Sequence, residues 1–564
     1  MSLKKFLAIG YLASIILLLA SYITSTRTIG TYFTSTIGFI DSLPLTYYIG
    51  YYLTITLIVV YALKSEGKAT LYAPLLLLSF ALFLDLPRYI FTYPFQRETF
   101  HQAQIFHLLL HNSLSGIPPH NENVANPIFW SIFIKITSLE PFLTVLYFAP
   151  TFLWLLTVLC LFTIIKRIFN SYRAFVGTFF FLAFFFEMFF ANRYAYTSPL
   201  FVLFVGLLIE SFRQSSRSFR MPLLLLAPAI TIAHVGHSTM ILVIMVTLAS
   251  LLTWYKFRGN LVNDHARTHV WNLALLLFVF YGFWYFVQEI RFYSIKLWFN
   301  AFIDVLHRGF FELRLIEAVY KLPLEPIYEL TVMARIVATL ISTIIPTLLA
   351  IFYVLRSMHA GMDADKIIRV GAAVCFVLFL IPLGVGVVEG IWSLRPLHLS
   401  MLFSPILIAL LLPRKLFKPL VIVTTFFSLI IAYILWIPNL GYIQVPDEKV
   451  ELIKFVSVYI PQHQTIGTIG TTEVERTLLT HIFSNRVDLS LRSISDPRSD
   501  KYEIVTENTL FVMIDPSIEV YEVKYVIEPG ILERIRLTRD VLVERECYNI
   551  VYDSSTLYSL LYKK

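Results

Sequence analysis

Charge and cysteine are both scarce in this sequence, and their scarcity excludes several classes of protein. Only 15% of the 564 residues are Asp, Glu, Lys or Arg, whereas a soluble domain carries roughly 25%. The three cysteines, Cys160, Cys375 and Cys547, lie far apart, and two of them fall inside apolar runs. Neither a disulfide framework nor a zinc knuckle is therefore indicated, and the chain is not a large soluble domain.

Several chemical motifs are absent as well. The sequence contains no P-loop, kinase motif set, nucleophile elbow or H-E-x-x-H pair. The stretch G-T-I-G-T-T at 467–472 lacks the third glycine of a dinucleotide fingerprint. Lys and Arg form no nucleic-acid-binding patch, and no N-x-[ST] sequon occurs. These absences exclude the common nucleotide-dependent enzymes and nucleic-acid binders.

Apolar residues dominate instead, at 57% of the chain. Runs of about 18 or more apolar residues recur, and each predicts a membrane span. We therefore expect residues 1–439 to form an all-α membrane domain with 13 spans. The predicted spans are 6–23, 44–63, 69–86, 142–165, 174–191, 197–212, 221–234, 238–255, 270–288, 332–355, 367–388, 398–413 and 419–437.

The short loops between these spans predict the orientation of the chain. Lys and Arg gather in alternate loops, which the positive-inside rule places in the cytoplasm, and this also explains the net charge of +8. The N-terminus is then cytoplasmic, and an odd number of spans puts the C-terminus outside the cell membrane. The first apolar stretch favours a retained signal-anchor over a cleaved signal peptide, because it is longer than a usual signal-peptide core.

The outer segments carry most of the chemistry. The loop 85–130 is a polar island between apolar runs, and a second long segment, 290–331, also faces outward in this topology. The stretch 126–141 is too short to span a membrane, so we expect it to be interfacial or re-entrant. The ionisable residues of the loop 85–130 include Asp85, Glu98, Glu122, His101, His107, His111 and His120.

Between their ends, the predicted spans have almost no ionisable groups. Those that occur near the outer ends are Asp85, Glu187, His234, Glu289, Arg335 and His398, while Glu210 lies at an inner end. Ion-coupled transporters usually place such residues near the bilayer midplane. The pattern instead favours a site for a substrate whose head group lies at the outer surface while its apolar tail remains in lipid.

Two carboxylates of the loop 85–130 are candidate catalytic groups. Glu98 begins an amphipathic helical pattern, so a helix at the membrane boundary would hold it as a general base toward an acceptor hydroxyl; alternatively, it is a solvated charge paired with Arg97. Asp85, beside Arg88, is either a second carboxylate facing a cavity or only a helix-end charge. His101 lies three residues after Glu98 on the same helical face, where it could tune the base, bind a metal or contact a sugar.

Candidate phosphate-binding and cavity-lining residues lie further along the chain. Arg395, in W-S-L-R-P-L-H, has the planar guanidinium that suits phosphate, although it could equally extend to lipid head groups. Arg308, next to His307, is a weaker candidate of the same kind. His234 and His237, in H-V-G-H, either line a cavity or simply occupy an interfacial turn.

The tail, 440–564, has a higher charge density and a different pattern, which predicts a small α/β domain. Helix-like segments at 447–459, 473–483 and 530–537 alternate with short strand-like runs. These runs are Thr465–Ile469, Thr509–Ile514, Tyr525–Ile527, Ile550–Tyr552 and Leu557–Leu561.

This layout resembles the GT-C class of integral membrane glycosyltransferases, which includes protein mannosyltransferases, aminoarabinose transferases and oligosaccharyltransferases. The resemblance rests on Glu98, the interfacial helix 99–114, Gly116 and the N-P-I-F approach at 126–129. The E-x-x-H spacing of Glu98 and His101 is similar to an acidic-x-x-His pattern of archaeal members. The ending C-Y-N-I-V-Y-D-S-S-T-L-Y-S-L-L-Y-K resembles the closing strands of their outer domains. The W-W-D-Y-G motif of oligosaccharyltransferases is absent.

The resemblance implies transfer of a sugar from a polyprenyl-phosphate or diphosphate donor, such as a dolichol carrier, to a protein, lipid or glycan acceptor. Glu98 would then be the base and Arg395 would stabilise the leaving phosphate, with inversion at the anomeric carbon. A divalent metal ion is left open, because metal dependence varies within the class. A glycan polymerase or ligase, a lipid or solute transporter and a non-catalytic scaffold are the alternatives.

Overall fold

The computed structural model describes the chain in stretches that contain all the helices and strands discussed below. They are residues 2–24, 43–64, 71–89, 94–96, 125–141, 144–184, 193–214, 220–257, 264–286, 326–357, 364–389, 394–436, 442–444, 465–469, 490–495, 511–514, 548–553 and 559–563, with the single residues Ile105, Leu108, Leu109, Leu452, Phe455 and Tyr459.

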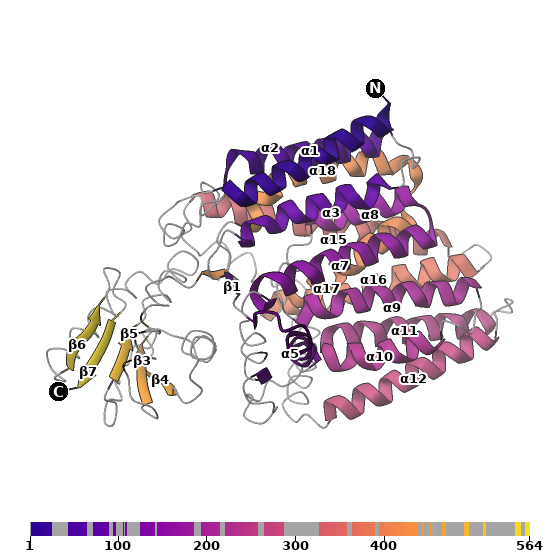
Figure 1. The fold of residues 1–564 in the computed structure, drawn as a ribbon. Helices are drawn as coiled ribbons and strands as arrows, with labels where there is room; N and C mark the ends of the chain where they lie inside the picture. Colours follow the sequence, from indigo (N-terminus) through magenta and orange to yellow (C-terminus); the bar gives the residue numbers. More distant parts are fainter. Residues whose placement is uncertain are drawn as a thin grey trace.

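Most of the described helices lie side by side in one bundle (Figure 1). Helices that follow one another through short links run in opposite directions, as expected for apolar segments that must satisfy their own backbone hydrogen bonds. The bundle contains α1 (Leu3–Thr24), α2 (Leu45–Lys64), α3 (Tyr72–Asp85), α7 (Ala149–Ile168), α8 (Ser171–Phe184), α9 (Arg193–Gln214), α10 (Arg220–Ala233), α11 (Val235–Phe257), α12 (Asp264–Phe286), α15 (Pro326–Ser357), α16 (Ala364–Glu389), α17 (Leu394–Leu411) and α18 (Phe417–Trp436).

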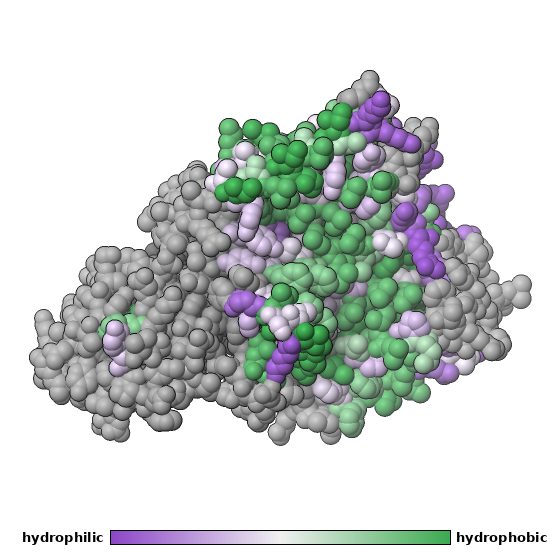
Figure 2. Space-filling model, in the orientation of Figure 1, coloured by the Kyte–Doolittle hydropathy of each residue, from purple (hydrophilic) through white to green (hydrophobic). Residues whose placement is uncertain are grey.

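The surface of the bundle is apolar. Among the described residues, four segments are long and apolar enough to cross a membrane: α1, α2, α7 and Gly236–Phe257 of α11. Figure 2 shows a continuous apolar surface over the helices, and a soluble monomer rarely exposes a patch of this size. Its exposed side chains include Ile9, Leu12, Ile16 and Leu19 of α1 and Leu275, Phe278, Val279 and Phe283 of α12. The chain is therefore a membrane protein, while the number of 13 spans stays a prediction.

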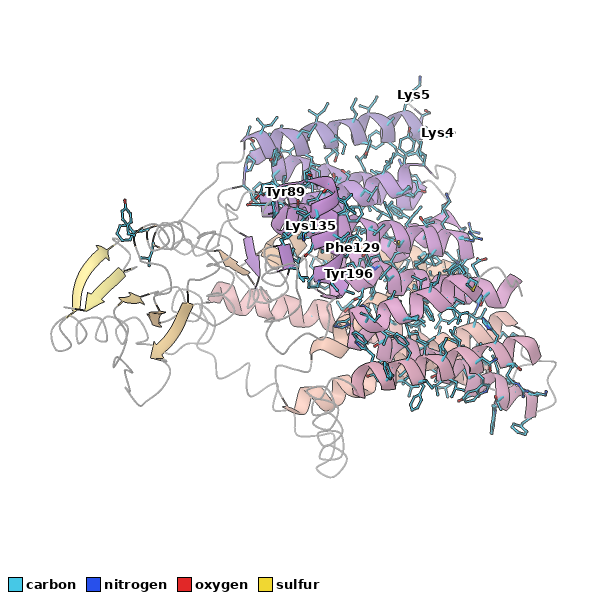
Figure 3. The ribbon with its side chains drawn as sticks, turned by 60° about the horizontal axis from the view of Figure 1, so that its bottom comes forward. Lys4, Lys5, Tyr89, Phe129, Lys135 and Tyr196 are labelled. Carbon is cyan, nitrogen blue, oxygen red and sulfur yellow. The ribbon has the colours of Figure 1, made fainter. Side chains whose placement is uncertain are left out.

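One end of the bundle, which we name the basic end, carries the cationic side chains. Figure 3 shows Lys4 and Lys5 at this end, and shows Tyr89 and Lys135 toward the opposite one. The basic end also includes Lys64, Lys166, Arg167, Lys256, Arg356, Lys366, Arg369, Arg414, Lys415 and Lys418, all exposed or half-exposed. This clustering fits the predicted alternation of basic loops. The side of the membrane on which the basic end lies stays a prediction.

Three buried hydroxyl groups connect the first three helices. Thr54 Oγ1 donates to the carbonyl oxygen of Gly50 at 2.8 Å, so the proton between Ser14 Oγ and Thr54 Oγ1, 2.6 Å apart, comes from Ser14. Ser14 Oγ then accepts from Ser79 Oγ at 3.0 Å. The hydrogen bonds run in one direction from α3 through α1 to α2, and each buried hydroxyl is satisfied.

Replacing Ser14 with alanine is expected to destabilise the fold by about 1 kcal/mol, since interhelical hydrogen bonds in membranes contribute about 0.6 kcal/mol each and Ser14 makes two. Thermal unfolding in detergent, followed by thiol labelling of the buried Cys375, measures the change. Thr56→Ala is the matched control, because Thr56 is exposed and donates to the carbonyl oxygen of Tyr52 in its own helix. Equal unfolding temperatures for the two variants would contradict the expected role of Ser14.

The tail contributes a five-stranded sheet in the order β4-β3-β5-β7-β6. β3 is parallel to β4 and β5, whereas β7 is antiparallel to β5 and β6. The strands are β3 (Thr465–Ile469), β4 (Ser490–Ser495), β5 (Phe511–Ile514), β6 (Tyr548–Asp553) and β7 (Ser559–Lys563). Four of them lie at predicted runs, and β4 was not predicted. The run Tyr525–Ile527 and nearly all of the predicted tail helices lie outside the described residues, so a separate α/β domain stays a prediction.

Candidate functional site

Asp85 ends α3 at the end of the bundle opposite the basic end. Its side chain is buried, with only 1% of the residue exposed, and Thr151 on α7 donates its hydroxyl proton to Asp85 Oδ2. The Trp154 indole N–H also joins α7 to α3, donating to the carbonyl oxygen of Ala81 at 3.3 Å. A buried carboxylate is costly unless donors compensate its charge, and the packing of α7 on α3 supplies one such donor.

Tyr89 extends this contact into a chain of hydroxyl groups. Its hydroxyl oxygen lies 2.7 Å from Thr151 Oγ1. While Asp85 is ionised, the single Thr151 proton is directed at the carboxylate, so Tyr89 must be the donor in the second bond. Tyr89 lies in the 3₁₀ helix η3 (Leu86–Tyr89), which directly continues α3. The order of donation is therefore Tyr89 to Thr151 to Asp85.

Aromatic rings surround the Tyr89 side chain. The Tyr22 ring, from the last turn of α1, meets it edge-on at a centroid distance of 6.0 Å. The Tyr147 ring, from the π-helical turn η5 (Thr144–Phe148) that precedes α7, lies 5.7 Å from it. Three elements thus position one phenol group beside the carboxylate. Because tyrosine rings prefer the boundary between lipid and water, this arrangement fits a site at a membrane surface.

The sequence predicted Asp85 but not its partners. Thr151 is 66 residues from Asp85 in the sequence. The only sequence feature that marks Thr151 is that it is a polar residue just inside an apolar run. Tyr89 lies in D-L-P-R-Y, and in this stretch the sequence analysis singled out Arg88 beside Asp85 but not Tyr89. Arg88 lies within η3 and Arg395 in the first turn of α17, but only their backbone is described. Glu98, His101 and Arg308 lie outside the described residues, so the convergence of these groups on one cavity stays a prediction.

The backbone just before Glu98 is paired with the start of the tail. β1 (Pro94–Gln96) runs antiparallel to β2 (Tyr442–Gln444), with Phe95 opposite Ile443. β2 follows the last helix of the bundle, so a segment almost 350 residues downstream contacts the loop 85–130. Neither strand was predicted, because three residues are too few for a recognisable alternation of apolar and polar side chains.

His237 and His234 form a buried pair at the junction of α10 and α11. His234 Nδ1 accepts the backbone N–H of His237 at 3.2 Å, so this nitrogen carries no proton. His237 Nδ1, 2.9 Å away, is therefore the donor to it, and Thr197 Oγ1 lies 2.9 Å from the same His237 nitrogen. Both rings make hydrogen bonds within the protein, and the role of His237 in substrate binding stays a prediction.

The helix α5 (Ala125–Thr137) corresponds to the predicted interfacial segment. In Figure 1 it is seen almost end-on, whereas the bundle helices cross the view. Trp130 and Ile134 are buried, while Ile132, Lys135 and Ile136 are exposed. A helix with one buried face and one exposed apolar face containing a lysine is typical of the membrane interface. Its residues Phe129 and Lys135 lie toward the same end of the bundle as Tyr89 (Figure 3).

Within the stretches that the structure describes, no three His, Cys, Asp or Glu side chains gather closely enough to hold a metal ion. The four histidines of the loop 85–130 and Glu98 lie outside these stretches. The described geometry instead provides a buried carboxylate, two hydroxyl groups that donate in series, and an apolar interface around them. These groups can accept a proton and orient a hydroxyl group.

Neither a protein-family model nor a curated protein sequence matches this chain. Its structure is similar to the crystal structure of the Archaeoglobus fulgidus oligosaccharyltransferase in complex with zinc and sulfate, with a TM-score of 0.48 and 11% identity over 86% of this chain and 72% of that one. The apo form gives a TM-score of 0.49 with 11% identity, over 92% and 75% of the two chains.

A third similar structure is the archaeal oligosaccharyltransferase AglB from Archaeoglobus fulgidus in complex with an inhibitory peptide and a dolichol-phosphate. Its TM-score is 0.47, with 11% identity over 92% of this chain and 74% of that one. Zinc, sulfate, peptide and dolichol-phosphate are ligands of those structures. The function proposed below depends on the sequence and geometry of the present chain.

Proposed function

We propose that the protein is a membrane glycosyltransferase that moves a sugar from a polyprenyl-phosphate-linked donor to an acceptor at the outer face of the membrane. The observation that carries the proposal is the position of Asp85. Among the described side chains, the buried carboxylates are Asp85 and Glu210. Glu210 lies at the basic end beside Arg167 at 3.7 Å, whereas Asp85 lies at the opposite end under the aromatic rings of Tyr89 and its neighbours.

The reaction needs a carboxylate at this boundary. The acceptor hydroxyl group loses its proton to the carboxylate, its oxygen attacks the anomeric carbon, and the bond from that carbon to the phosphate oxygen breaks. The configuration of the sugar inverts, because attack and departure occur on opposite faces. Glu98 acts as the base and Asp85 as the second carboxylate of the site. Proton transfer by a positioned group accelerates such steps by about 10²- to 10⁴-fold.

The remaining predicted residues surround these two carboxylates in the proposal. The guanidinium groups of Arg88, Arg395 and Arg308 bind phosphate oxygens, for which their planar geometry is suited. His101 and His237 contact the sugar or orient the base. The pairing of β1 with β2 supports the backbone that leads to Glu98, which gives the tail a structural part in the site. The N-terminus and the basic end are then cytoplasmic.

Glycan polymerisation or ligation would use the same groups, with a longer sugar chain as acceptor or donor. Lipid or solute transport is less well supported. Among the described side chains, the buried Asp, Glu and His residues of the bundle lie at or near helix ends: Asp85, Glu210, His234 and His237. A coupled transporter would be expected to have such groups near the bilayer midplane.

The direct test replaces Glu98 with glutamine in the full-length protein reconstituted in liposomes. We expect transfer of radiolabelled sugar from a polyprenyl-phosphate donor to fall by about 10²-fold or more, because glutamine keeps the shape of glutamate but cannot accept the proton. Glu122→Gln, in the same loop 85–130, is the matched control and should retain transfer. Wild-type transfer by the Glu98 variant would remove Glu98 from the mechanism.

A further inference from the structure

Four phenylalanine rings form a continuous stack from α5 onto α7. The Phe129 and Phe133 rings of α5 are stacked at a centroid distance of 6.3 Å. Phe133 stacks on Phe148 at 5.9 Å, with only 8° between the ring planes. Phe148 stacks on Phe152 at 5.6 Å. We name these four rings the phenylalanine ladder, which joins the interfacial helix to a helix long enough to cross the membrane.

The rings of the ladder pack against a buried tryptophan, while three of them remain partly exposed. Trp130 is buried beneath it and meets the Phe148 and Phe152 rings edge-on, each at 6.3 Å. Phe129, Phe148 and Phe152 are nevertheless exposed by 40%, 41% and 42%. Stacked and edge-on ring pairs have preferred geometries that are worth more than simple apolar contact. The ladder therefore offers a preformed aromatic surface to an apolar ligand from the membrane.

This surface borders the carboxylate site through α7. Successive residues of an α-helix are rotated by about 100°, so Thr151 and the ladder residue Phe152, both on α7, lie about 100° apart around its axis. Thr151 donates to Asp85. Tyr147, which directly precedes Phe148, contacts the Tyr89 ring. The ladder and the carboxylate site thus occupy neighbouring faces of one helix. A ligand whose tail lies along the ladder can place its head group beside Asp85.

Lys135 adds a positive charge to α5, the helix that carries Phe129 and Phe133. Lys135 is exposed, and it lies one helical turn after Ile132 and next to Ile136 on the exposed apolar face. Lys135 and Phe129 lie on the same helix, and Figure 3 shows both toward the same end of the bundle as Tyr89. An ammonium group on an apolar interfacial face is complementary to a lipid phosphate. A ligand that suits both the rings and this charge has a long apolar tail and an anionic head group.

We propose that the phenylalanine ladder binds the isoprenoid chain of the lipid-phosphate substrate, with the Lys135 ammonium group paired to its phosphate. This inference rests on the proposed function, and it assigns residues that hold the donor. An isoprenoid chain carries a double bond and a methyl group in every repeat, so it offers planar and C–H surfaces that suit stacked aromatic rings. Saturated acyl chains lack these double bonds and methyl groups.

Photo-crosslinking tests the ladder without requiring sugar transfer. The probe is a polyprenyl monophosphate with a diazirine in its prenyl chain, added to full-length protein in phosphatidylcholine liposomes. Phe148→Leu combined with Phe152→Leu keeps both positions apolar but removes the rings. We expect crosslinking at a fixed probe concentration to fall about tenfold, as the loss of two aromatic contacts predicts. Lys135→Gln is expected to lower it by about two- to fivefold, as for an exposed ion pair.

The matched control is Phe278→Leu combined with Phe283→Leu on α12, where the two side chains are exposed by 62% and 68%. This variant should crosslink like the wild type. Equal crosslinking by the control and the ladder variant would overturn the proposal. So would equal competition by phosphatidic acid and by unlabelled polyprenyl phosphate, because the ladder would then be an ordinary lipid contact.

The ladder and the proposed function can fail separately. Glu98→Gln should abolish transfer but retain crosslinking to the probe, since it leaves the ladder intact. If the ladder variant crosslinks normally while transfer still requires Glu98, the ladder assignment is wrong and the enzyme assignment stands. If crosslinking depends on the ladder while Glu98→Gln and Asp85→Asn transfer normally, the protein binds a lipid phosphate but the proposed chemistry is wrong.

Discussion

Replacing Asp85 with asparagine is expected to lower sugar transfer by about 10²-fold or more, because it removes the fixed negative charge of the second carboxylate, and preorganised groups of this kind contribute about 10²- to 10³-fold. Asparagine is nearly isosteric with aspartate, and its amide oxygen can still accept the Thr151 hydroxyl proton. The contact between α3 and α7 is therefore retained, and the variant should unfold at nearly the wild-type temperature. The measurements are single-turnover transfer in liposomes and thermal unfolding of the same preparations.

Glu210→Gln is the matched control for this substitution. Glu210 is also a buried carboxylate on a bundle helix, but it lies at the basic end beside Arg167. It should retain transfer if catalysis occurs only at the end that contains Asp85. Thr151→Val is expected to destabilise the protein by about 1–3 kcal/mol, because it withdraws a hydroxyl donor from a buried carboxylate. Undiminished transfer by Asp85→Asn would leave Asp85 as a helix-end group with a structural role.

Features that depend on a local residue pattern could be predicted from the sequence. Asp85 follows a long apolar run and lies two residues before Pro87, so its position at the end of a helix could be predicted from the sequence. The strand Thr465–Ile469 has the short β-rich pattern bounded by polar residues that predicts a strand, and it forms β3. α5 was expected to be interfacial because its apolar run is too short to span and contains Lys135.

Contacts between distant segments could not be predicted in the same way. The Thr151 hydroxyl becomes the donor to Asp85 only because α7 packs on α3, and the single sequence carries no record of that pairing. The strands β1 and β2 likewise exist only through each other. The π-helical turn before α7 gives no periodic signal, because it is a local departure from the helical repeat. The phenylalanine ladder depends on both this turn and the packing of α5.

The histidines show that the number and spacing of a residue type do not by themselves determine its role. His101, one of four histidines in the loop 85–130, was a candidate metal ligand, but all four positions lie outside the described residues. Two histidines that the structure does place, His234 and His237, are hydrogen-bonded to each other, and His237 also to Thr197, inside the protein. Their spacing in H-V-G-H is compatible with a cavity lining and with an internal pair. Only the orientation of α10 relative to α11 and α9 determines which hydrogen bonds form.

Replacing Gly177 with valine is expected to cause a large loss of stability in the bundle. Gly177 lies on α8 where it meets α17, and a Cβ atom there would lie 2.9 Å from the backbone oxygen of Pro405. A backbone carbonyl cannot rotate away as a side chain can, so the two helices would have to separate. Arg173 opposes this separation, because its Nη1 donates to the carbonyl oxygen of Ala409 at 2.5 Å. Close helix contacts through glycine are characteristic of membrane proteins.

The expected cost of Gly177→Val is about 1–3 kcal/mol or more, as for overpacking of a tightly filled interior. Unfolding followed by thiol labelling of Cys375, which is buried on α16, should show a clearly lower transition temperature. Gly282→Ala is the control, because a Cβ at Gly282 meets no atom within 4 Å. That substitution should be neutral or stabilising by up to about 1 kcal/mol, since alanine is the better helix former. If both variants unfolded together at the wild-type temperature, the contact between α8 and α17 would be looser than the 2.9 Å approach at Pro405 requires.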